Sequence, residues 1–95
     1  MPSYLVETFL PRAAAAERGT LGRRASSAAE AMTKAGTRVR FTGLIHVPED
    51  EIGFFGFSAA SAEAVAAVAD RAGLRALRVV EAISFMEGAS TCAVD

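Results

Sequence analysis

The sequence has little of the residues that mark secreted, metal-clamping or membrane-spanning chains. Its 95 residues include one cysteine, one histidine, three prolines and no tryptophan. The single Cys92 cannot form an internal disulfide, and no cysteine pair offers a metal clamp. No stretch approaches the roughly 20 apolar residues that span a bilayer, and the first residues lack a basic opening and a cleavable apolar run. We therefore predict a cytoplasmic protein that does not bind a membrane.

An excess of charge of one sign is also missing. Ten basic and 11 acidic residues give a formal net charge of -1. This balance does not favour a phosphate backbone, so nucleic acid is not an expected partner. There is no phosphate-cradling glycine loop, nucleophile elbow or metalloprotease helix. With 52% hydrophobic residues, the chain is long enough for one core and too short for two.

Four segments have the pattern of β-strands, because they are rich in β-branched, aromatic or alternating apolar residues. They cover residues 4–10, 38–47, 52–57 and 77–85. The segment 52–57 is apolar on both faces, which is typical of a central strand. Alternation along 38–47 predicts Val39, Phe41, Gly43 and Ile45 on one face and Leu44 and His46 on the other.

Two segments have helical spacing. The first runs from a possible N-cap at Thr20 to Ala35, with small apolar residues on one stripe and a left-handed stop at Gly36. The second is capped by Ser61 and stops at Gly73. Residues 12–19 have no clear period and are interpreted as a connector or a loose helical turn.

The order of these elements predicts one α+β domain over residues 1–85, a ferredoxin-like βαββαβ sandwich, followed by a flexible tail over 86–95. Its four-stranded antiparallel sheet has the first and third strands in the centre and both helices on one face. The open face is predicted to carry Leu5, Phe9, Leu44, Val79, Ile83, Phe85 and at least one of Phe54 and Phe55. Such a contiguous apolar surface predicts a homodimer packed sheet against sheet. The alternative is a tail that folds back over this face through Met86 and Val94.

Four short motifs, taken in order, resemble a known family. They are Val6–Pro11, Val47–Glu51, Arg71–Leu74 and Arg78–Ala82. The family consists of small bacterial proteins of unassigned function and includes nickel-binding members, and the resemblance covers roughly residues 3–85. It implies a ferredoxin-like fold, a dimer and, for some members, nickel or another divalent metal held by imidazole and carboxylate ligands. This chain has one histidine and no cysteine near it, whereas borderline metals favour several imidazole or thiolate ligands.

Two carboxylates and the histidine are the candidate site residues. Glu7 and Glu81 are each mid-strand on neighbouring strands and are expected to point toward the open face. As a close pair they would form a general acid or base, or half of a metal site. The alternative is that each pairs with an arginine such as Arg40 or Arg78, or makes a hydrogen bond across the dimer. His46, expected on the same side as Glu7, is a candidate base or metal ligand, or a hydrogen-bonded surface residue.

Two further clusters have a structural and a functional interpretation. Glu49, Asp50 and Glu51 follow Pro48 and suit either turn chemistry or a hard cation, and turn chemistry is favoured. The phenylalanines of 52–57, with Gly53 and Gly56, suit either a core or a pocket for a flat ligand.

Three functions remain open from the sequence. The leading one is a dimeric binding protein that holds a metal ion or a small apolar ligand in an inter-sheet or sheet-helix cavity. Its polar or apolar contacts would be Glu7, Arg40, His46, Phe54 and Glu81. The second is a cofactor-independent monooxygenase, cyclase or isomerase of the dimeric α+β-barrel type, with His46, Glu81 or Glu7 transferring protons. The third is an interaction protein whose open face docks a larger partner.

Overall fold

The computed structural model describes residues 1–84. The predictions for Phe85, the tail, Met86, Cys92 and Val94 therefore lie outside the described residues. The elements along the chain are β1 (Ser3–Phe9), the 3₁₀-helix η1 (Arg12–Glu17), α1 (Arg18–Lys34), β2 (Val39–Val47), β3 (Ile52–Ala59), α2 (Ala62–Arg71) and β4 (Ala76–Ala82). No helix among these residues is both long and apolar enough to cross a membrane.

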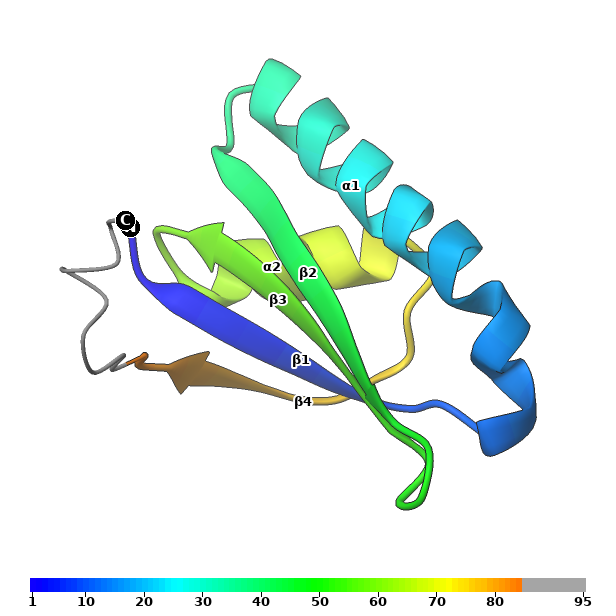
Figure 1. Ribbon diagram of the computed structural model, residues 1–95. Helices are drawn as coiled ribbons and strands as arrows, with labels where there is room; N and C mark the ends of the chain where they lie inside the picture. The colour runs from blue at the N-terminus through cyan, green and yellow to red at the C-terminus, as the bar shows by residue number, and fades with distance from the viewer. Residues whose placement is uncertain (85–95) are drawn as a thin grey trace, which may run out of the picture.

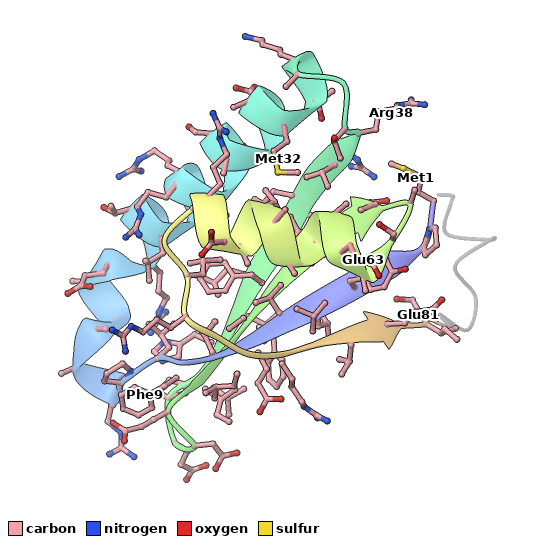
Figure 2. All side chains as sticks on the ribbon, turned by 180° about the vertical axis from the view of Figure 1, so that it is seen from behind. Met1, Phe9, Met32, Arg38, Glu63 and Glu81 are labelled. Atoms are coloured by element: carbon pink, nitrogen blue, oxygen red, sulfur yellow. The ribbon has the colours of Figure 1, made fainter. Side chains whose placement is uncertain are left out.

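The four strands form one antiparallel sheet in the order β2-β3-β1-β4. This confirms the predicted α+β class and the central positions of β1 and β3. Figure 1 shows α2 behind the strands and α1 running beside β2, and Figure 2 shows α2 in front of the strands from the opposite side. One sheet face is therefore covered by helices and the other is open.

The core lies between the helices and one face of the sheet. Its buried members are Val6, Ala25, Ala28, Ala29, Val39, Phe55, Phe57, Ala59, Val65, Val68, Ala69 and Ala72. The three alanines of α1 have little side chain to keep the helix away from the strands, so α1 packs closely, as its small-residue stripe predicted. The ring of Phe57 packs against that of Phe41, with 5.5 Å between centroids. Burial of these apolar side chains is the main stabilising contribution to the fold.

The helix ends follow the predicted signals except at the start of α1. Ser61 caps α2, because its hydroxyl accepts a hydrogen bond from the Ala64 N–H at 3.2 Å. Gly36 has a φ of 110°, which suits a left-handed stop. α1 begins at Arg18, not after a cap at Thr20, because η1 continues directly into it. The connector over 12–19 is thus helical, and the Thr20 hydroxyl accepts a hydrogen bond from Arg23.

A bulge in β2 overturns the predicted faces of its second half. The pairing of β2 with β3 shifts register between Phe41 and Gly43, and Gly43 has a φ of 152°. An extra residue in one strand reverses the alternation that follows it. Leu44 and His46 therefore lie on the helix-covered face, and Ile45 lies on the open face.

The predicted alternation of β4 is correct, but its faces are reversed. Val79 pairs with Val6 of the core and Glu81 pairs with Tyr4, so both lie on the helix-covered side. Val80 lies on the open face instead. Both faces of this strand carry a valine, so alternation alone does not tell which side is inner.

The open face of the sheet is nonetheless apolar. By register its apolar members are Leu5, Phe9, Ile45, Val47, Ile52, Phe54, Val80 and Ala82. Leu5, Phe9 and Phe54 were predicted there, whereas Leu44, Val79 and Phe55 are on the other side. Phe9 and Ile45 are each 62% exposed, and Ile83, beyond the end of β4, is 89% exposed.

Candidate functional site

A pocket of about 430 Å³ opens between the end of β1, the η1–α1 segment and the loop from α2 to β4. We call it the η1 pocket. Its lining residues are Thr8, Phe9, Leu10, Pro11, Ala13, Ala14, Glu17, Leu21, Phe55, Gly73, Leu74 and Arg75. Most of these are apolar, and the buried Phe55 belongs to the core as well. The pocket therefore reaches the hydrophobic interior from outside.

Local sequence signals explain why the chain does not fill this pocket. Pro11 ends β1, because it cannot donate to the ladder and cannot continue a central strand. Four alanines follow within η1, and their small side chains form a thin wall. On the other side Gly73, with a φ of 77°, turns the chain away from α2 before Leu74. The two connections therefore frame the opening.

The polar groups of the η1 pocket are few. The Thr8 hydroxyl donates to the Gly53 carbonyl at 3.4 Å, so this buried group is satisfied within the protein. Glu17 and Arg75 are exposed members of the lining and supply one charge of each sign. An apolar pocket with a few polar groups is the usual composition of a site for a small organic molecule.

His46 lies on the helix-covered side, where both of its ring nitrogens are engaged. Arg18 Nε donates to Nδ1 at 3.0 Å, and Nε2 lies 3.0 Å from the Leu10 carbonyl oxygen. Because the arginine can only donate, Nδ1 must accept and Nε2 must carry the proton that goes to Leu10. The ring thus joins the end of β2 to the start of α1 and the end of β1. In this state it offers no free lone pair to a metal.

Glu7 lies on the open face and pairs with an arginine, which was the structural alternative in the sequence analysis. Its Oε1 accepts a hydrogen bond from Arg78 Nε at 2.7 Å. The Glu7 side chain is 18% exposed, whereas that of Arg78 is 67% exposed. The carboxylate is therefore matched by a cation within its own chain.

The predicted constellation of Glu7, His46 and Glu81 is not assembled. Glu81 is exposed on the helix-covered side of β4, opposite in face to Glu7. His46 is on the other edge strand, and three strand spacings correspond to about 14 Å. Figure 2 shows Phe9, which lines the η1 pocket, at one end of the molecule and Glu81 at the other. Within residues 1–84, no group of three or more His, Cys, Asp or Glu side chains could hold a metal ion.

Two other predicted ligand contacts are placed on the open face. Phe54 pairs across the sheet with Glu7 and Ile45. Arg40 pairs with Ser58, four residues further along β3, and is exposed. The open face therefore brings Phe54 and Glu7 together, while Arg40 lies toward the far end of the strands.

The space beside the two glycines of β3 is occupied by neighbouring side chains. A Cβ at Gly53 would lie 2.9 Å from Leu10 Cδ2, and one at Gly56 would approach the Thr42 hydroxyl at 2.5 Å. Phe55 and Phe57 are buried in the core. The two glycines therefore serve close packing, Phe55 and Phe57 belong to the core, and Phe54 lies on the open face.

The acidic turn has the structural role that was favoured. The Glu51 N–H donates to the Pro48 carbonyl at 3.1 Å, which closes the turn. The Glu51 carboxylate accepts from the Arg12 N–H at 3.1 Å, and its carbonyl accepts from the Leu10 N–H at 2.9 Å. Glu51 also has a φ of 54°, an unusual conformation for a residue with a Cβ. The turn therefore ties the β2–β3 hairpin to the start of η1.

Replacing Glu51 should separate these two effects. Glu51→Ala loses the carboxylate bond and keeps the left-handed backbone, so we expect a loss of about 1 kcal/mol of unfolding free energy. Glu51→Gly loses the same bond but removes a backbone cost of about 1 kcal/mol, so it should be the more stable variant. Urea denaturation measures both, with the exposed Asp50→Ala as the control. Equal stability of Glu51→Ala and the unaltered protein would contradict this role.

No protein-family model matches the chain, and no curated protein matches it. A solved structure is similar in fold. It is the crystal structure of SCO4226 from Streptomyces coelicolor A3(2), which is 23% identical, with a TM-score of 0.57. The match covers 88% of this chain and 99% of that chain. At this identity the likeness shows the fold alone.

The η1 pocket is not predictable from local patterns in the sequence. Its walls come from the end of β1 and the adjoining η1, and from the loop before β4, which lies far away in the chain. The available signals were the break at Pro11, the run of alanines over 13–16 and the stop at Gly73. Each signal marks a local feature, and none shows that the three meet.

Proposed function

We propose that this chain is the subunit of a homodimeric, ferredoxin-like binding protein of the cytoplasm that holds a small, mainly apolar organic ligand in the η1 pocket. The single observation that carries the proposal is the pocket itself. Its volume of about 430 Å³ is within the range of about 300–1,000 Å³ for small-molecule sites, and its walls are mostly apolar.

The sheet order supports the ferredoxin-like assignment. A helix follows β1 and β3, and β2 and β3 are joined by the turn at 48–51. The order β2-β3-β1-β4 is the arrangement expected when two split βαβ units share one sheet.

The composition of the open face supports the dimer. Eight apolar residues from all four strands cover it, and the pair of Glu7 and Arg78 is matched within one chain. Four strands at about 4.8 Å spacing and about 25 Å length give a projected area of about 500 Å². The accessible area of side chains exceeds their projection, which brings the face close to the roughly 600 Å² per partner of small stable interfaces. A second copy covers it with a self-complementary surface.

The hydrogen bonds of His46 and Glu7 favour an organic ligand over bound nickel or a proton-transfer reaction. Both ring nitrogens of His46 are bonded within the protein, and Glu7 is paired with Arg78. The enzyme hypothesis required one cavity joining His46 to Glu7 or Glu81, and the sheet places these groups on opposite faces or opposite edges. The η1 pocket depends on none of them.

Binding of 8-anilinonaphthalene-1-sulfonate tests the pocket, because this probe joins an apolar ring system to one anionic group. Ala14 lines the pocket and is partly buried, so Ala14→Trp should fill it and weaken binding at least about tenfold by calorimetry. Ala15 is the next residue of η1, is exposed and is not in the lining. Ala15→Trp should leave the affinity within about twofold.

The two tryptophan variants share the same chemistry, so their comparison locates the probe. Equal affinity of Ala14→Trp and the unaltered protein would place the probe elsewhere and remove the support for this pocket. Thermal unfolding of both variants, at the same protein concentration, confirms that each remains folded at the temperature of the titration.

A further inference from the structure

A second hollow lies between α1 and the end of α2. This groove, of about 520 Å³, is lined by Arg23 and Arg24 of α1 and by Arg71 of α2. Thr20 and Ser27 add hydroxyl groups, and the remaining lining consists of alanines. No carboxylate is among its lining residues. We call it the arginine groove.

The guanidinium of Arg24 is fixed in the groove. Its Nε and Nη2 donate to the Ala72 carbonyl oxygen at 3.1 and 2.7 Å. Gly73 makes room for this contact, because a Cβ at that residue would overlap Arg24 Nη2. A guanidinium carries five N–H donors, so three of those on Arg24 remain for another acceptor.

Arg23 is positioned in a similar way. Its Nη2 donates to the Thr20 hydroxyl at 3.3 Å, one turn earlier on α1, which leaves four N–H donors. Arg71 is in the last turn of α2 and approaches the groove from the opposite helix. Donors therefore reach the groove from two directions, and two of the three side chains are held before any ligand arrives.

The charge of this cluster is not neutralised within the described chain. Over residues 1–84 the one ion pair joins Glu7 to Arg78, on the far side of the molecule. The end of the α2 dipole favours cations at Arg24 and Arg71, but it does not explain Arg23. Three like charges gather although the whole chain has a net charge of -1. All three charges would attract an anion that enters the groove.

We propose that the arginine groove binds the phosphate group of a small soluble phosphate monoester. Guanidinium groups match phosphate oxygens with paired N–H donors, and a dianion presents enough oxygens for three arginines at once. The site is separate from the η1 pocket and does not depend on the function proposed for that pocket.

Titration with inorganic phosphate, followed by ¹H–¹⁵N NMR at constant ionic strength, tests the site. We expect saturable shifts at the backbone amides of Arg23, Ser27, Arg71 and Ala72. The double variant Arg23→Gln/Arg71→Gln keeps the structural contact of Arg24, and it should weaken binding at least about tenfold. Arg12→Gln/Arg38→Gln is the matched control, because it removes the same charge from exposed residues outside the groove.

Three results of this titration would overturn the proposal. They are an absence of saturable shifts, shifts spread evenly over the surface, and equal weakening in the two double variants, which would indicate general charge attraction.

Glycerol 3-phosphate and vesicles of phosphatidylcholine with phosphatidic acid distinguish the source of the phosphate. We expect the soluble ester to give the same shifts and the vesicles not to sediment the protein, whereas sedimentation that needs Arg23 and Arg71 would overturn the assignment to a soluble ligand.

Discussion

Replacing Ile45 with glutamate should convert the proposed dimer to a monomer. Ile45 is 62% exposed on the open face, so a charge there costs the single chain little. In a dimer packed through this face the same carboxylate is buried without a partner, once in each copy. An uncompensated buried charge costs about 3–5 kcal/mol, so the dimer dissociation constant should rise at least about a hundredfold.

Light scattering coupled to size exclusion measures this change in mass. Ala66→Glu, on the exposed side of α2, makes the same change in charge and should leave the mass unaltered. Phe9→Glu adds a second test from another strand, because Phe9 is also 62% exposed on the open face. A dimer that persists unchanged in both open-face variants would show that another surface joins the copies.

Replacing Phe54 or Phe55 with alanine should affect two different properties, dimer association and the stability of the core. Phe55 is 1% exposed in the core, so Phe55→Ala should cost about 3–5 kcal/mol and lower Tm on the order of 15 °C or more. Phe54 is the next residue but lies on the open face. Its removal should act chiefly through dimer association.

Thermal unfolding at several protein concentrations separates the two effects. The Tm of a dimer rises with concentration, because association stabilises the folded state by mass action. Phe55→Ala should have a lower Tm at every protein concentration but the same dependence of Tm on concentration. Phe54→Ala should lose most of that dependence. The account would be wrong if Phe54→Ala kept the full concentration dependence of the unaltered protein.

Signals that act within a few residues were sufficient to predict most of the fold. Ser61 and Gly36 mark helix ends because each acts through its own side chain or backbone dihedral. The central positions of β1 and β3 follow from the order of strands and helices, because few connections of that order are possible.

The faces of the strands could not be predicted in the same way. The bulge at Gly43 reverses the second half of β2, and a glycine within a strand does not by itself show whether a bulge is present. That one shift moved His46 away from Glu7, and the reversed faces of β4 moved Glu81 away as well. The candidate site built on these three residues therefore depended on which sheet face each side chain lies on, and the sequence does not determine this.

The η1 pocket and the arginine groove were missed for a different reason. Each is made where segments distant in sequence come together, so its chemistry is visible only after packing. The sequence shows Arg23, Arg24 and Arg71 as ordinary helix-surface cations. Their shared groove depends on how α1 crosses α2.

The central claim about the assembly of this protein is that the open face of the sheet meets a second copy of itself. Sedimentation equilibrium of the unaltered protein measures this directly. We predict a mass of twice the 9.9 kDa of one chain at micromolar concentration. A mass of 9.9 kDa at concentrations up to about a millimolar would contradict it.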